Sequence, residues 1–145
     1  MTEEIVIKKK KKRKTGINTK AKKKTAIARA VIRKGTGRVK INKASLETIT
    51  PIRVRKFIEE PLVVAEEISK GADIDVNVHG GGFMGQAVAI RSAIAKALVE
   101  FGKDKKLKEK FLSYDRLLLV DDPRRKEAKK PLGPRARSKK QKSKR

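Results

Sequence analysis

The pattern of apolar and polar residues predicts a folded middle that begins with β-strands. Residues 25–33 alternate with apolar residues on both parities, which is typical of a strand that is at least partly buried on both faces. Gly35–Gly37 signals a turn, and residues 38–42 then alternate cleanly, with Val39 and Ile41 on one side. We expect these two runs to pair as a β-hairpin. The basic residues on its other side fit either an RNA contact or an ordinary solvated face, and the pattern does not choose between them.

The following segments predict one short helix and one more strand. Leu62–Ser69 has its apolar residues at helical spacing after Pro61, and Gly71 is expected to end the helix. Residues 74–79 alternate again, so we expect a strand whose Ile and Val side chains face the core.

A long amphipathic helix is predicted over residues 86–101. Its apolar side chains share one face, namely Ala87, Ile90, Ile94, Ala97, Leu98 and Phe101. Ser92, Lys96 and Glu100 are expected to point away from the core. A further helix over residues 105–112 and a short apolar run over residues 117–120 close the domain. The predicted fold class is an α/β (α+β) two-layer sandwich, a small sheet with helices packed on it.

The charge of the chain is concentrated at its two ends. The 145 residues include 41 Lys and Arg against 16 Asp and Glu, a formal net charge of +25. Residues 1–24 carry +9 and residues 123–145 carry +11, whereas residues 25–122 carry only +5. The ends have too few apolar residues to offset the entropy of ordering, so we expect disordered arms that order on a partner. The predicted organisation is a basic N-terminal arm (1–24), a globular domain (25–122) and a basic tail (123–145).

Such a charge surplus predicts a polyanionic partner, and a nucleic acid is the obvious one. The run of seven basic residues from Lys8 to Lys14 would also serve as a nuclear-localisation or heparin-binding cluster. Two basic arms that flank a folded core are harder to explain by targeting alone. The chain has no Cys, which excludes disulfides and thiolate sites, and it shows neither a signal peptide nor an apolar run long enough for a membrane span.

The glycine run matches the spacing of a cofactor-binding motif, but the sequence that follows it does not fit such a motif. Gly80, Gly82 and Gly85 formally satisfy the dinucleotide-binding spacing between a strand and a helix. The fingerprint requires an acid at the end of the next strand, about 20 residues further on, but the next candidate strand ends at Asp121, 41 residues after Gly80. No second half of a doubly wound sheet follows. The glycines fit either a phosphate of RNA at a helix N-terminus or a tight strand-to-helix turn. We therefore predict no cofactor, no metal and no catalytic residue, with His79 structural or facing RNA.

The glycine run also carries a family resemblance. Gly80–Leu98 closely resembles the characteristic motif of the universal ninth small-subunit ribosomal protein (S-nine) family. Shorter matches are spread from about residue 20 to the C-terminus: Lys24–Ala30, Glu60–Leu62, Asp122–Arg125 and Gln141–Arg145. The tail is more similar to archaeal than to bacterial members. The lysine run before residue 15 departs from the shorter family pattern, so an RNA contact there rests on charge alone.

The resemblance implies a non-enzymatic structural constituent of the small ribosomal subunit, working in the cytoplasm. It implies a two-layer fold with a left-handed βαβ crossover. It also implies that the protein is located in the head of the small subunit, where it binds ribosomal RNA beside neighbouring proteins. Its tail would reach peptidyl-site transfer RNA. The competing hypothesis is a free nucleic-acid architectural protein of the chromatin type, and a nucleotide-dependent enzyme is a third that rests only on the glycine spacing.

These considerations yield two sets of candidate residues. Those expected to contact transfer RNA are Ser143, Lys144 and Arg145. Those expected to contact ribosomal RNA are Lys8, Lys9, Lys10, Lys11, Lys12, Arg13, Lys14, Lys22, Lys23, Lys24, Arg38, Lys40, Gly80, Gly81, Gly82, Gln86, Arg91, Arg124, Arg125, Lys129, Lys130, Arg135, Arg137, Lys139 and Lys140. Because exposed aromatic residues are scarce, we expect phosphate contacts rather than base stacking.

Overall fold

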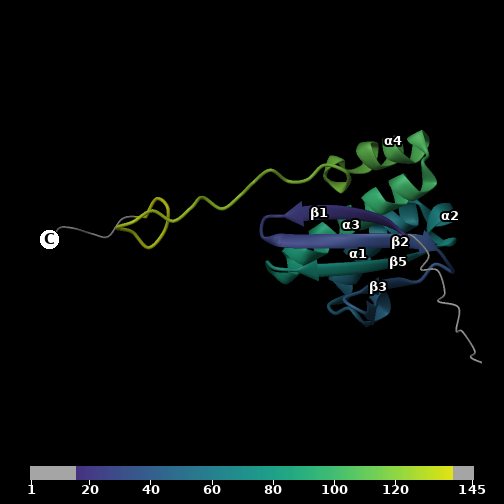
Figure 1. Ribbon diagram of the computed structural model, residues 1–145, viewed down its shortest axis with the longest axis horizontal. Coiled ribbons are helices and arrows are strands. Elements are labelled where there is room, and N and C mark those ends of the chain that lie inside the picture. Colours follow the sequence, from purple (N-terminus) through teal and green to yellow (C-terminus); the bar gives the residue numbers. More distant parts are fainter. Residues whose placement is uncertain (1–15, 139–145) are drawn as a thin grey trace, which may run out of the picture.

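The computed structural model describes residues 16–138, which form one five-stranded sheet with helices behind it and a long C-terminal tail (Figure 1). The strands are β1 (Ile17–Lys23), β2 (Ala26–Lys34), β3 (Val39–Ile41), β4 (Ala44–Ser45) and β5 (Ala72–His79). The helices are α1 (Ile52–Val64), α2 (Glu66–Ser69), α3 (Phe83–Gly102) and α4 (Lys105–Tyr114), with short 3-10 turns η1 (Leu46–Thr48) and η2 (Arg116–Leu118). The predicted mixed α/β class is confirmed.

The predicted pairing of the second and third strands is wrong. The sheet order is β1-β2-β5-β3-β4, so β5 lies between the two strands that were expected to form a hairpin. β2 pairs with β5 in antiparallel fashion over eight residues, whereas β3 offers only three residues and pairs with β5 in parallel. A parallel pair needs a long crossover connection, and α1 and α2 supply it between β3 and β5.

A strand also occupies part of the predicted N-terminal arm. Residues 17–23 form β1, an edge strand that pairs with β2 through a turn at Lys24 and Thr25. Thr19 and Ala21 are buried, and the Thr19 hydroxyl donates to the Ala93 carbonyl oxygen at 3.0 Å. The sheet-forming part of the chain therefore begins at residue 17, and the predicted arm upstream of residue 16 lies outside the described residues.

Helix α3 packs across β1, β2 and β5 and makes the core. Small side chains on β2, such as Ala28 and Ala30, let the helix approach closely, and both are fully buried. The predicted long helix and the strand over residues 74–79 are confirmed in place and in their buried faces. The prediction that Ser92 points away from the core is wrong, because Ser92 is buried and its hydroxyl donates to the Leu117 carbonyl oxygen at 2.9 Å.

The predicted short helix after Pro61 begins ten residues too late. α1 starts at Ile52 and runs through Pro61, because Val54, Ile58 and Pro61 recur at helical spacing and are all buried. The helix predicted over residues 105–112 is confirmed as α4, and the apolar run over residues 117–120 falls in and after η2 rather than in a strand. No helix of residues 16–138 is long and apolar enough to cross a membrane.

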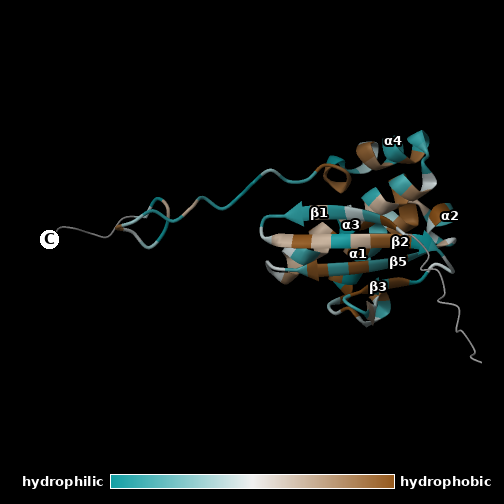
Figure 2. Ribbon diagram, viewed as in Figure 1, coloured by the Kyte–Doolittle hydropathy of each residue, from teal (hydrophilic) through white to brown (hydrophobic). Residues whose placement is uncertain are grey.

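All the long helices lie on the same side of the sheet, so the other face is free of helices (Figure 1). Polar and apolar residues alternate along β2 and β5, and the tail after η2 is mainly hydrophilic (Figure 2). The tail leaves the domain from the end of the sheet where β1 and β5 finish.

Candidate nucleic-acid interface

Three segments that are far apart in the sequence meet at one end of the sheet, which we call the tail-root end. They are the β1–β2 turn (residues 22–25), the glycine run (residues 80–82) and the start of the tail (residues 121–125). β1 and β5 both finish at this end (Figure 1), and the end of β1 contacts the tail root, since Lys22 and Lys23 donate to Asp121 and Asp122. Of the predicted cations, Lys23 lies close to Arg124, because both contact the carboxylate of Asp122.

The glycine run packs against the β1–β2 turn. Gly80 and Gly81 have positive φ angles of 74° and 66°. A Cβ atom at Gly80 would lie 2.5 Å from the Thr25 carbonyl oxygen, and one at Gly81 would lie 3.0 Å from the Ala26 Cβ atom. The side-chain amide of Gln86 donates to the Gly80 carbonyl oxygen at 3.1 Å and closes the loop. The close approach predicted for this run is therefore made to the protein's own hairpin.

Gly82 differs from its two neighbours. It is the N-cap of α3 with an extended backbone (φ −97°), and a Cβ atom there would meet nothing within 4 Å. The fold therefore does not require a close approach by Gly82, so a tight strand-to-helix turn accounts for Gly80 and Gly81 but not for Gly82. The capping position leaves backbone N–H groups of the first turn of α3 without a side-chain cap.

Two carboxylates fasten the start of the tail to this end. Asp121 accepts from the Lys22 backbone N–H at 3.4 Å and from Lys96 Nζ at 2.7 Å. Asp122 forms an ion pair with Lys23 and accepts from Arg124, whose Nη2 lies 2.7 Å from its Oδ2. The hydrogen bonds from Arg124 and then Lys23 hold the pKa of Asp122 well below its usual range.

The attachment of the tail root through Asp121 and Asp122 was not predicted from the sequence. A signal was available, since Asp121 and Asp122 directly precede a 23-residue tail that contains a single acid, Glu127. Lys96 was expected only to point away from the core. In the structure it links α3 to the tail root, and Lys96 Nζ also donates to the Lys20 carbonyl oxygen at 3.2 Å.

Beyond Asp122 the tail runs away from the domain and exposes its cations (Figure 1). Arg124 is engaged with Asp122, while Lys130 and Arg137 lie 3.6 Å and 2.9 Å from the carboxylate of Glu127. Within the described part of the tail, the exposed predicted residues that have no ion pair are Arg125, Lys129 and Arg135. The predicted Lys8, Lys9, Lys10, Lys11, Lys12, Arg13, Lys14, Lys139, Lys140, Ser143, Lys144 and Arg145 lie outside the described residues.

Arg91 does not belong to an RNA-contacting surface. Its side chain is 9% exposed, and its guanidinium lies 2.7 Å from Asp115 and 2.5 Å from Glu60. The same group stacks over the Phe57 ring, 4.5 Å from the ring centroid. The prediction that Arg91 contacts RNA is therefore corrected: a buried cation needs partners of its own, and here it joins α1, α3 and the end of α4.

Arg38 and Lys40 are exposed, but they lie away from the tail-root end. They precede and occupy β3, which runs parallel to β5, so they sit near the start and middle of β5 rather than at its end. Phe83, which sequence analysis left without a role, is 67% exposed directly after the glycine run. It provides an exposed aromatic ring at the tail-root end.

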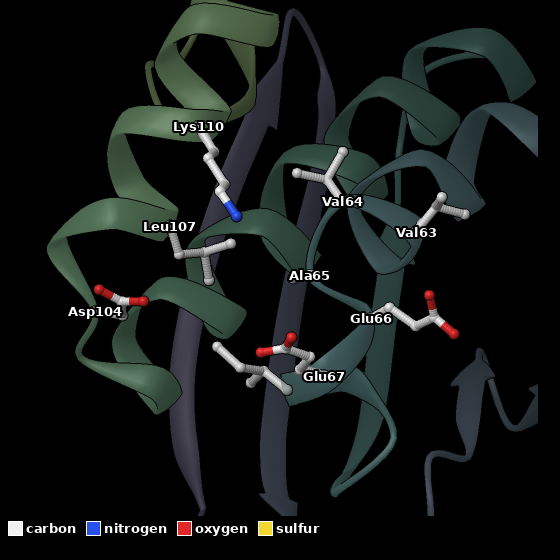
Figure 3. Close-up of a pocket in the computed structure, with 9 residues that line it drawn as sticks. Val63, Val64, Ala65, Glu66, Glu67, Asp104, Leu107 and Lys110 are labelled. Carbon is white, nitrogen blue, oxygen red and sulfur yellow. The ribbon is translucent and has the colours of Figure 1, made fainter.

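A hollow of about 260 Å³ between α2 and α4 has a different character (Figure 3). Its polar lining includes Glu66, Glu67 and Asp104, with Lys110 at its edge. Between Phe57 and Ser69 the chain has four Glu and no Lys or Arg. Carboxylates repel a polyanion, so this hollow is unsuited to RNA.

An α+β domain with a cationic tail attached at its root suits a protein whose partner is a polyanion. The family model "Ribosomal protein S9/S16" matches residues 21–145. The small ribosomal subunit protein uS9 of Pyrobaculum aerophilum is 54% identical over 123 residues, which cover 84% of this chain and 86% of that protein. The uS9 protein of Methanothrix thermoacetophila is 50% identical over 127 residues, 88% of this chain and 96% of that protein.

The chain belongs to the ribosomal protein S9/S16 family. It is accordingly a structural constituent of the ribosome in the cytoplasm and not an enzyme. The resemblance to archaeal members is confirmed by these two relatives.

Proposed function

We propose that this chain binds ribosomal RNA in the head of the small ribosomal subunit and reaches peptidyl-site transfer RNA with its C-terminal tail. The observation that carries the proposal is the tail-root end. There the β1–β2 turn, the glycine run and the first tail residues come together, and Asp121 and Asp122 fasten the tail. The relatives' name, small ribosomal subunit protein, supports the proposed location in the small subunit.

Contact with ribosomal RNA is proposed to be led by phosphates. Lys22, Lys23 and Lys24 lie at the turn, and the exposed tail adds Arg125 and Lys129. Cations that neutralise phosphates release counterions from the RNA, which provides affinity without reading sequence. Neighbouring proteins of the subunit head complete the proposed set of partners.

The proposed contact with transfer RNA belongs to the last three residues. Arg145 would present a forked guanidinium to a phosphate, Lys144 a compact point charge, and Ser143 a hydroxyl donor. Charge-assisted hydrogen bonds of this kind contribute roughly 1.5–3 kcal/mol each before screening. The fastening at Asp122 supports this role, because a tail held at its root delivers its tip over a restricted volume.

Deletion of Ser143–Arg145 separates the two contacts. Most of the cations that would hold ribosomal RNA remain, so we expect normal incorporation into small subunits with weaker binding of peptidyl-site transfer RNA or altered reading-frame fidelity. A matched control, Lys105→Gln with Lys108→Gln on α4, removes the same two charges elsewhere and should leave transfer RNA binding unchanged. Unchanged affinity and fidelity in the deletion variant would refute the tail assignment.

Sedimentation of cell extract tests whether the chain associates with the small ribosomal subunit. Comigration of the wild-type chain with the small subunit at moderate salt is expected. A chain that sediments with DNA instead would support a free architectural protein of the chromatin type.

A further inference from the structure

The helix-free face of the sheet, which we call the open face, is lined by a separate group of cations. Lys20 on β1, Arg29 and Arg33 on β2 and Lys40 on β3 point to the side opposite α3, since the alternate residues of each strand are the buried ones. Register brings them together: Lys20 pairs with Arg29 across β1 and β2, and Arg29 pairs with Asn77 across β2 and β5.

These four cations have no ion-pair partner among residues 16–138. The acids on the same face are Asp73 and Asp75. Asp73 is engaged elsewhere, because its Oδ1 accepts the backbone N–H groups of Thr36 at 2.8 Å and Arg38 at 3.1 Å. These bonds, the one from Arg38 first, hold the pKa of Asp73 below its usual value. The four cations outnumber these two acids, so the open face keeps a net positive charge.

A shallow hollow of about 370 Å³ lies within the open face. Three cations, Arg33, Lys40 and Lys43, line it together with the carboxylate of Asp75 and the amide of Asn77. Lys43 is held there by the β3–β4 turn, where Asn42 and Lys43 both have positive φ angles, 48° and 71°. The Asn42 side chain fixes the turn to β5, since it accepts from the Val78 backbone N–H at 2.9 Å and donates to the Val78 carbonyl oxygen at 3.1 Å.

We infer that the open face is a second RNA-binding surface, which docks on the backbone of a double-helical RNA segment. The inference rests on the proposed function and adds a surface to it, distinct from the tail-root end. Four strands from β1 to β3 span roughly 14 Å, wide enough to meet several phosphates of a helix. The amides of Asn18 and Asn77 between the cations suit 2′-hydroxyl groups in the shallow groove of RNA. The Phe and Tyr residues of the described chain lie on the helices, and the imidazole of His79 at the end of β5 is the aromatic ring that these strands place on the open face. Contacts on this face are therefore expected to be led by phosphates rather than by base stacking.

The absence of cysteine from the chain permits a direct test. A single cysteine introduced by Asn77→Cys or Asn18→Cys can carry an iron chelate that cleaves nearby RNA by hydroxyl radicals. Glu67→Cys, at the acidic α2, is the matched control. In small subunits assembled with the full-length labelled chain, we expect cuts in ribosomal RNA helices from both open-face positions and none, or much weaker ones, from Glu67→Cys.

The outcomes separate the inference from the proposed function. Incorporation without cuts from either open-face position would overturn the inference and leave the proposed function intact, as would a neighbouring protein found covering this face. Failure of the wild-type chain to join the subunit would overturn both.

A second measurement uses charge. Arg29→Gln with Lys40→Gln should lower the slope of the salt dependence of RNA binding by about two, since each phosphate contact contributes about one. Lys106→Gln with Lys108→Gln on the exposed side of α4 removes equal charge and should change that slope little. Equal changes in the two double variants would show that only total charge matters and would refute a docking face.

Discussion

Arg91 is one of 41 basic residues in the sequence, yet its neighbours give it a role that composition cannot show. Its guanidinium lies between Glu60 and Asp115 and over the Phe57 ring. Helical spacing placed it beside apolar positions of α3, but the carboxylates that it meets come from α1 and from the residue after α4. Such partners are set by tertiary packing, which the pattern of a single helix does not contain.

Arg91→Gln should therefore destabilise the fold rather than remove an RNA contact. It leaves two partly exposed carboxylates close together without their cation, and we expect a loss of roughly 3 kcal/mol in the free energy of unfolding. Urea unfolding measures the loss. Arg91→Lys keeps the positive charge but loses the forked guanidinium, so its free energy of unfolding should lie between those of the wild type and of Arg91→Gln. A variant that unfolds like the wild type but binds RNA more weakly would contradict this assignment.

Within the glycine run, Gly80 and Gly82 are expected to respond differently to the same substitution. Gly80→Ser must place a Cβ atom against the Thr25 carbonyl oxygen at a positive φ, so we expect a loss of roughly 2 kcal/mol or more in unfolding free energy. Gly82→Ser is the matched control, because it has open space and adds a hydroxyl that can cap α3. It should be neutral or slightly stabilising in thermal unfolding. Equal losses in the two variants would contradict the packing role of Gly80.

At the scale of elements, the sequence predicted what depends on local period. β5, α3 and α4 were predicted near their observed positions because their apolar residues recur regularly. The partner of β2 was not predictable in this way, since the choice between β3 and β5 depends on contacts across 40 residues of chain. β1 was missed because its buried residues are only Thr19 and Ala21, set among lysines that suit an edge strand.

The candidate site was predictable to the same extent. The partition of charge indicated basic ends and a balanced middle, but not which cations would meet. Lys23 and Arg124 come together because β1 ends where the tail begins, and that follows from strand order rather than from composition.

The fastening of the tail root by Asp122 predicts a pH dependence. The folded-state pKa of Asp122 is lowered, so its contribution to stability is fully present above its ordinary pKa near 4 and is lost as pH falls through the folded value. Asp122→Asn should lack this contribution at every pH. The difference in unfolding free energy between wild type and variant should thus be constant from pH 5 to 7 and shrink below about pH 4.

Urea unfolding at several pH values measures that difference. Asp75→Asn serves as the control, because Asp75 has no ion-pair partner within residues 16–138. A difference that grows on acidification would show that the lowered pKa of Asp122 has been misassigned.

At the scale of the whole molecule, charge is arranged by direction. Among residues 16–138, the tail-root end and the open face carry cations without ion-pair partners, while Glu59, Glu60, Glu66 and Glu67 gather at the end of α1 and in α2. The helical side is not acidic throughout, since α4 carries Lys105, Lys106, Lys108 and Lys110. A long-range field of this kind orients an approaching polyanion toward the basic surfaces.

This arrangement predicts a steep salt dependence of RNA binding by the full-length chain. If six to ten phosphates are neutralised, the affinity should fall by about 10³ to 10⁵ between 50 and 200 mM salt, using the figure for duplex DNA. Filter binding or fluorescence anisotropy with a non-cognate RNA duplex measures the slope. A nearly flat dependence would mean that base stacking or apolar contacts dominate. Phe83 would then be the first residue to test, because it is an exposed aromatic ring directly after the glycine run, with the exposed Met84 beside it.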